Sequence, residues 1–161
     1  MNLHALESAA EADPCVLGLT PPGRIETSAI PLPAISDPSL SKQTHLEFIN
    51  FAHAYEHLVT KQIAAKVKVG FVDTGVDCNH PDIAALLVMG CGFDALSGGS
   101  PVDNDGHGGH VMGLAGAVIN NSVGVSGVIG ASLELHAIRV IDVNSGTVQD
   151  AYEGIQYAIM N

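Results

Sequence analysis

The sequence contains no Trp, few other aromatic residues and few basic ones. Six Lys and Arg stand against 17 Asp and Glu, which gives a formal net charge of −11. So few positive charges cannot neutralise a useful number of phosphates, and we therefore do not expect binding to nucleic acid. Binding to an anionic membrane surface is excluded for the same reason. The excess of acidic groups suits solubility, cation binding or basic substrates.

Long apolar runs are also missing. No stretch approaches the ~18 apolar residues of a transmembrane helix. The first residues, from Met1 to Pro14, are acidic and have no basic stretch ahead of an apolar one, so we do not expect an ordinary signal peptide. These absences leave the cellular compartment of the protein open.

Cysteine is scarce, with Cys15, Cys78 and Cys91 widely spaced and no Cys-x-x-Cys pair. An odd number at such spacings argues against a disulfide framework and against a zinc ribbon. We therefore expect three buried or free thiols.

The 161 residues are long enough for one domain with a core of its own. Six of the eight prolines fall within the first 38 residues. Residues 1–36 are therefore predicted to be a poorly ordered linker or a remnant of an upstream segment. Periodic patterns begin after this point, so the domain is predicted to cover residues 37–161.

Hydrophobic periodicity predicts the elements of an α/β fold with a parallel sheet. Spacings of three and four residues predict helices over 42–65, 107–119 and 148–160. Apolar and alternating runs predict strands over 66–72, 86–93 and 133–141, with loops over 97–105 and 120–130. The helix over 107–119 has four glycines, which a sequence tolerates where neighbouring backbone approaches closely. We expect that helix to be buried on nearly every side.

Two segments carry the residues of chemical interest. Asp73 follows a predicted strand, where functional groups gather in α/β sheets, and His107 opens a predicted helix. A carboxylate that orients an imidazole, and an imidazole that accepts a proton, are two members of a nucleophilic triad. We also expect the positive end of the helix dipole to keep His107 neutral.

Together these segments resemble the Asp and His motifs of the subtilisin-like serine peptidases, the subtilases. The first runs from Val69 through Asp73-Thr-Gly-Val-Asp77 to His80-Pro-Asp82, and the second is Asp105-Gly-His-Gly-Gly-His-Val-Met-Gly113. The resemblance extends in order over residues 37–161. It implies a three-layer α/β sandwich with a mostly parallel sheet, present here as the truncated N-terminal part of the domain. It also implies that the strand before Asp73 has a bare apolar edge, which invites association or aggregation.

The resemblance assigns roles to several residues. Asp73 and His107 match the catalytic Asp and His of the family. Ile141 and the stretch Asn144-Ser145-Gly146 are similar to the wall that binds substrate through backbone pairing. From the residues alone, we prefer to interpret Ser145-Gly146 as a turn that enters a helix.

A calcium site is implied as well, because oxygen ligands suit this cation. The matching side chains are Asp37, Asp82 and Asn121, joined by the backbone carbonyls near Ile119, Val123 and Val125. The alternative is that Asp82 caps a helix and that the Asn pair only turns the chain.

Some residues depart from the family pattern. Gly109 stands where Thr is usual, which removes a hydroxyl that braces the loop, and Met112 stands where Ala is usual. The 161 residues contain no Gly-Thr-Ser sequence of the kind that carries the nucleophile, and the oxyanion Asn is missing too. The chain is therefore expected to be inactive as a peptidase by itself.

Three functions follow as hypotheses. The first is a serine endopeptidase acting on peptides or proteins, with a complementary C-terminal half supplying Asn and Ser. The second is a non-catalytic pseudo-peptidase that binds peptides or a partner. The third is a metal hydrolase that uses His107 and His110 with Asp73 or His80, although Gly-Gly between the two His fits zinc chemistry poorly.

Overall fold

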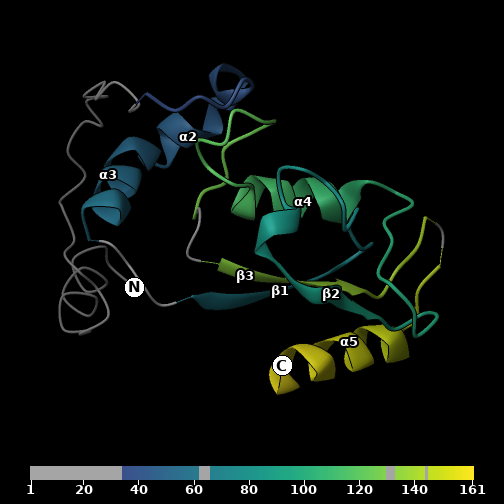
Figure 1. The fold of residues 1–161 in the computed structure, drawn as a ribbon. Coiled ribbons are helices and arrows are strands. Elements are labelled where there is room, and N and C mark those ends of the chain that lie inside the picture. Colours follow the sequence, from purple (N-terminus) through teal and green to yellow (C-terminus); the bar gives the residue numbers. More distant parts are fainter. Residues whose placement is uncertain (1–33, 62–65, 130–132, 144) are drawn as a thin grey trace, which may run out of the picture. The chain divides into compact units, whose positions relative to one another are not determined.

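The computed structural model of the protein describes residues 34–61, 66–129, 133–143 and 145–161 (Figure 1). Residues 1–33, which make up most of the predicted linker, lie outside the described residues. The prediction that they are poorly ordered therefore stays a prediction.

The segment predicted as one helix over 42–65 is divided in the structure, so that prediction is wrong in its first part. A 3-10 turn η1 spans Leu40–Lys42, a short helix α2 spans His45–Phe48, and α3 spans Phe51–Lys61. Asn50 separates α2 from α3 with a positive φ of 57°. A helix cannot continue through a residue in this left-handed conformation, which Asn adopts more readily than most residues do. Residues 62–65 lie outside the described ranges.

Three parallel strands form the sheet, as the sequence predicted. They are β1 (Val67–Asp73), β2 (Leu87–Asp94, preceded by the 3-10 turn η2, Ala84–Leu86) and β3 (Leu133–Arg139). Their order is β1-β3-β2, so the strand that comes last in the chain lies between the other two. Val67 of β1 aligns with Leu133, and Asp73 aligns with Arg139.

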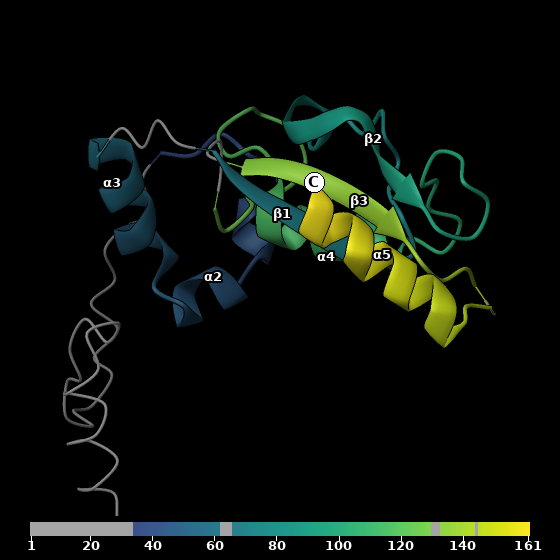
Figure 2. The same cartoon turned by 90° about the horizontal axis from the view of Figure 1, so that it is seen from below.

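Helices cover both faces of this sheet, which confirms the three-layer α/β architecture (Figures 1 and 2). On one face, α4 (His107–Gly116) places Gly116 against the side chains of Leu133 and Leu135. On the other face, α5 (Val148–Met160) places Gly154 against Ile138 and Val140. Side chains alternate between the two faces of a strand, so β3 packs against both helices at once.

The main core lies between α4 and the sheet. Met112 of α4 is fully buried there, so its bulk is accommodated by its neighbours. His107 and His110 are exposed on the same helix, so α4 is less completely buried than we expected. The buried members of the core are Val76, Ile83, Leu86, Cys91, Met112, Leu133, Leu135 and Ala137.

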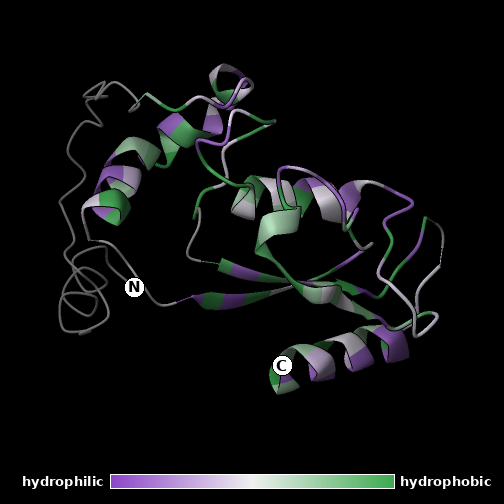
Figure 3. Ribbon diagram, in the orientation of Figure 1, coloured by the Kyte–Doolittle hydropathy of each residue, from purple (hydrophilic) through white to green (hydrophobic). Residues whose placement is uncertain are grey.

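Strand β1 forms one edge of the described sheet, as the sequence predicted. Val67 is 57% exposed and Val72 is 37% exposed on this strand. Helix α5 nearby carries both hydrophobic and hydrophilic residues along its length (Figure 3). Several of its apolar side chains are exposed, namely Val148, Tyr152, Ile155, Ile159 and Met160. Apolar groups therefore remain uncovered on an edge strand and on the helix next to it.

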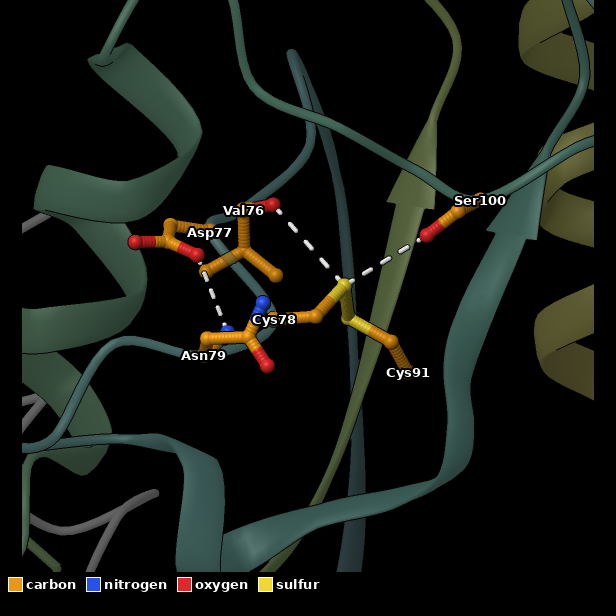
Figure 4. Close-up of a disulfide and its surroundings, with 6 residues drawn as sticks. All are labelled: Val76, Asp77, Cys78, Asn79, Cys91 and Ser100. Atoms are coloured by element: carbon orange, nitrogen blue, oxygen red, sulfur yellow. Dashed lines mark hydrogen bonds between the residues drawn. A yellow bond between two sulfur atoms is a disulfide. The ribbon is translucent and has the colours of Figure 1, made fainter.

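The expectation of three buried or free thiols is wrong for two of them, because Cys78 and Cys91 form a disulfide (Figure 4). Their Cα atoms lie 5.8 Å apart. Cys91 occupies an irregular part of β2 between Gly90 and Gly92, and all three residues have positive φ. The odd cysteine count could not reveal this pair, because it depends on how β2 returns alongside the loop after β1. Cys15 lies outside the described residues.

Within the described ranges, none of the helices combines the length and the hydropathy that crossing a bilayer requires.

Candidate active site

The candidate site begins at the ends of the strands. Asp73 is the last residue of β1 and aligns with Arg139, which ends β3; Asp94 ends β2 and also aligns with Arg139. Because parallel strands finish at the same edge of a sheet, three charged side chains collect there. Arg139 donates to Asp94 at 2.9 Å and forms a second ion pair with Asp142 at 2.8 Å. This pairing holds the strand ends together beside Asp73.

His107, the first residue of α4, lies against Asp73. The distance from its Nδ1 to Oδ1 of Asp73 is 2.7 Å. The carboxylate is mostly shielded, with 18% of its side chain exposed, whereas the imidazole is 63% exposed. The structure therefore brings together the two residues that the motifs predicted, with the imidazole open to an incoming group. Their catalytic roles stay a prediction.

The direction of the pKa shift of His107 differs from our expectation. The hydrogen bond and the negative charge of Asp73 raise the pKa of His107 above its ordinary value of 6.5, and Asp105 and Asp103 add to this effect. The net shift is therefore opposite in direction to the one we expected from the helix dipole alone. A carboxylate in direct contact outweighs the partial charge at a helix end.

A second carboxylate, Asp103, organises the loop that leads into α4. It accepts hydrogen bonds from the hydroxyl of Thr74 and from the backbone N–H groups of Asp105, Gly106 and Gly109. Burial alone would raise the pKa of Asp103, but these hydrogen bonds outweigh it and lower the pKa.

Sequence reasoning missed both Asp103 and Thr74. The signal was present in Asp103-Asn-Asp-Gly106, because an Asp side chain commonly closes a turn on the backbone N–H two residues further on, as Asp103 does with Asp105. The backbone N–H of Gly109 braces this loop against Asp103, so the lack of a hydroxyl at position 109 does not leave the loop unsupported.

The predicted substrate wall lies between β3 and α5. Ile141 is 44% exposed, and Ser145 and Gly146 are exposed as well. The backbones of Asp142 and Ser145 exchange two hydrogen bonds ahead of α5. The backbone N–H of Val140 donates to the carbonyl of Asp73 at 3.0 Å, so this segment starts beside the catalytic candidates. Asn144 lies outside the described residues, and the substrate role of the segment stays a prediction.

The predicted calcium ligands converge on the loop after α4. Asp37 is buried, and its carboxylate accepts from the backbone N–H groups of Asn120 and Asn121 and from the hydroxyl of Ser126. Asp82 is also buried, and it accepts from Nδ2 of Asn121 and from the backbone N–H of Val125, both at 2.8 Å.

Oxygen donors of the kind that suit calcium converge on this loop, and in the arrangement described they accept hydrogen bonds from the protein itself. Two buried carboxylates and an amide meet at one loop, and Ile119, Val123 and Val125 belong to that loop. In the arrangement described, Asn121 turns its Nδ2 toward Asp82, and its Oδ1 accepts from the N–H of Val123. The carboxylate of Asp82 therefore holds the loop by hydrogen bonds and does not cap a helix.

The zinc hypothesis finds no geometric support. In the part of the chain that the structure describes, no three side chains of His, Cys, Asp or Glu are grouped closely enough to hold a metal ion. Nδ1 of His107 is taken by Asp73, and Nδ1 of His80 accepts from the backbone N–H of Asp82 at 3.3 Å.

Comparison with known proteins agrees with this geometry. The model of the subtilase family (Peptidase_S8) matches residues 64–161. Thermitase of Thermoactinomyces vulgaris is 42% identical over 92 residues, which cover 56% of this chain and 32% of thermitase. Subtilisin E of Bacillus subtilis is 35% identical over 141 residues, which cover 78% of this chain and 35% of the subtilisin.

Solved structures add a further likeness. A protease from Pseudoalteromonas arctica PAMC 21717 has a TM-score of 0.51 and 26% identity, over 75% of this chain and 43% of its own. The chain belongs to the subtilase family, whose model matches most of its length. The fold, with helices on both sides of a parallel sheet, and the Asp–His pair at the strand ends agree with this class. The chain spans about a third of the length of the two curated relatives named above.

Proposed function

We propose that this chain is the part of a serine endopeptidase that carries the general base and the residue that orients it. The observation that carries the proposal is the 2.7 Å contact between Nδ1 of His107 and Oδ1 of Asp73 at the carboxyl edge of the sheet. A Ser nucleophile and an oxyanion donor have to come from polypeptide beyond these 161 residues.

The two residues divide the work between them. Asp73 holds Nδ1 of His107 and so fixes the tautomer in which Nε2 is free to accept a proton. Nε2 takes the proton of the Ser hydroxyl as that oxygen attacks the peptide carbonyl. It then gives the proton to the departing amine. Water next attacks the acyl group, Nε2 accepts a proton from that water, and the proton is returned to the Ser oxygen as the acid product leaves. Asp73 stays ionised throughout and stabilises the imidazolium.

The substrate is proposed to be a peptide or protein in extended form. Ile141, Asn144, Ser145 and Gly146 are the proposed contact segment, in which backbone groups pair with the substrate as an added strand. The exposure of the described members and their position next to the end of β1 support this role.

A fusion protein tests the catalytic proposal. The chain is joined to the part of thermitase that lies beyond the matched region, and the fusion is treated with a fluorophosphonate probe. We expect the Ser of the thermitase part to be labelled, and we expect His107→Ala to abolish labelling. Asp73→Asn should slow turnover by about 10⁴, because the loss of the orienting carboxylate had an effect of that size in a known triad.

Control samples separate the alternatives. A fusion in which the nucleophilic Ser is replaced by Ala sets the background of the assay. The unfused chain should remain unlabelled. Labelling of a folded fusion that is unchanged by His107→Ala would overturn the assignment, and a folded fusion that is never labelled would favour the non-catalytic hypothesis.

Calcium is the proposed structural cofactor. Asp37, Asp82 and Asn121 would hold it, with backbone carbonyls of the same loop. When bound, the cation would cross-link the segment before η1, the loop after β1 and the loop after α4. Two buried carboxylates in a chain of net charge −11 favour the approach of a divalent cation.

A further inference from the structure

Helix α4 has no cap of its own, although its first turn carries His107. The residue before the helix is Gly106, which has no side chain to accept a hydrogen bond and adopts a φ of 94°. The first N–H groups of a helix lack partners within the helix, so other residues have to accept from them.

Asp105 accepts from the backbone N–H of His107 at 3.2 Å. Thr74 and Asp103 supply the acceptors for the next two N–H groups from outside the helix. The backbone N–H of Gly108 donates to Oγ1 of Thr74 at 2.8 Å, and that of Gly109 donates to Oδ2 of Asp103 at 2.8 Å. The hydroxyl of Thr74 in turn donates to Oδ1 of Asp103 at 2.8 Å, which joins the two acceptors. The two peptide groups that follow His107 are therefore both fixed by this pair.

The same pair is connected to the other side of the site. The backbone N–H of Thr74 donates to Oδ1 of Asp73 at 2.7 Å, the oxygen that also contacts His107. Thr74 is buried at 7% exposure, which shields its hydrogen bonds from exchange with water. One residue thus contacts both the carboxylate that orients the imidazole and the helix turn that carries it.

We propose that Thr74 and Asp103 are positioning residues that fix the first turn of α4 and so hold the imidazole of His107 against Asp73. The part of this inference that concerns catalysis rests on the proposed function. Without the pair, the first turn of α4 could rotate or fray, and the imidazole would move away from the carboxylate. Proton transfer depends steeply on such geometry.

Thr74→Val tests the proposal without changing any charge. Val keeps the shape of Thr but loses the hydroxyl, while Thr74→Ser restores a hydroxyl at the same position. The readout is the pKa of the His107 imidazole, followed by NMR in the full chain and assigned with His107→Gln. We expect the pKa to fall toward its ordinary value in Thr74→Val and to stay raised in Thr74→Ser. A folded Thr74→Val variant with an unchanged pKa would overturn the proposal.

A second pair of variants covers the case in which Thr74→Val does not fold, as judged by circular dichroism. Asp103→Asn and Asp105→Asn each remove one negative charge near His107. Within the described residues, Asp105 accepts only from the backbone N–H of His107, whereas Asp103 joins Thr74 to the N–H of Gly109. We expect the larger fall in the pKa of His107 from Asp103→Asn. Equal falls would mean that charge alone acts, and would refute the positioning role.

Asp73→Asn separates this inference from the proposed function. If Asp73→Asn lowers the pKa of His107 while Thr74→Val and Asp103→Asn do not, the Asp–His pair stands and the positioning role fails. If Asp73→Asn itself has no effect, the pair on which the proposed function depends is absent.

Discussion

At the scale of single residues, the contact between α4 and the loop after β1 requires glycine at position 108. A Cβ atom added there would lie 2.3 Å from the carbonyl oxygen of Gly75, which is backbone and cannot rotate away. The close approach lets the N–H of Gly108 reach Thr74. All glycines of this helix lower its helix propensity, but they differ in whether a close backbone contact requires them.

Gly108→Ala and Gly113→Ala make a matched test of this point. Overpacking a core typically costs about 1–3 kcal/mol, and a collision with backbone costs more. We therefore expect Gly108→Ala to lower the free energy of unfolding by at least about 1–3 kcal/mol. Gly113 is buried in the same helix, but an added Cβ meets no atom within 4 Å. Gly113→Ala should therefore raise the free energy by up to ~1 kcal/mol. Urea unfolding of both variants measures the difference, and equal effects would contradict it.

The raised pKa of His107 gives stability a defined pH dependence. Because Asp73 favours the imidazolium, the folded chain binds a proton more tightly than the unfolded chain does. The stabilising contribution is complete below the ordinary pKa of 6.5 and disappears as the pH rises through the raised value. We expect the melting temperatures of the wild type and His107→Gln to differ most in acid and to converge at alkaline pH. A gap that widens with pH would contradict the assigned pair.

At the scale of elements, the disulfide ties the loop after β1 to β2. A cross-link that closes a loop of about 15 residues contributes ~3 kcal/mol by restricting the unfolded chain. Replacing both Cys78 and Cys91 with Ser should therefore lower the free energy of unfolding by about this amount. Cys15→Ser leaves the cross-link intact and serves as the control. Unchanged stability of the double variant, measured without reductant, would count against the bond.

The edge of β1 predicts how the chain behaves in solution. Among the described strands β1 pairs only with β3, so its other edge, with exposed Val67 and Val72, is a template for another strand. We expect the chain to self-associate, and we expect Val67→Lys to reduce this association in sedimentation velocity experiments. Phe48→Lys adds the same charge at an exposed side chain of α2 and should have less effect. A wild-type chain that sediments as a clean compact monomer would refute the prediction.

The elements show how far the sequence alone leads. Strands and helices with strong periodicity, such as β1, β3 and α5, were predicted within one or two residues of their observed bounds. The break between α2 and α3 was missed because it depends on the backbone conformation of one residue, Asn50, within an otherwise helical pattern. The Asp73–His107 contact was predicted from motifs, whereas the Cys78–Cys91 bond and the Thr74–Asp103 link depend on contacts between loops that no periodicity records.

At the scale of the whole molecule, calcium would act on segments that are far apart in the sequence. A ligand that binds only the folded state at 100 times its Kd stabilises that state by about 2.7 kcal/mol. We expect calcium to raise the melting temperature and a chelator to lower it. Asp82→Asn should abolish this response, while Asp77→Asn, a change at a carboxylate outside the set, should retain it. A melting temperature that is insensitive to both additions would remove calcium from the proposal.

The order β1-β3-β2 also constrains how the chain reaches its native state. While the polypeptide is being made, β1 emerges from the ribosome long before β3, its partner, has been synthesised. β2 faces the same delay, because it too pairs only with β3 among the described strands. Such non-local pairing is slow, and it leaves two apolar segments waiting in the nascent chain. Nascent chains stalled before residue 133 should therefore recruit chaperones more strongly than chains that include β3.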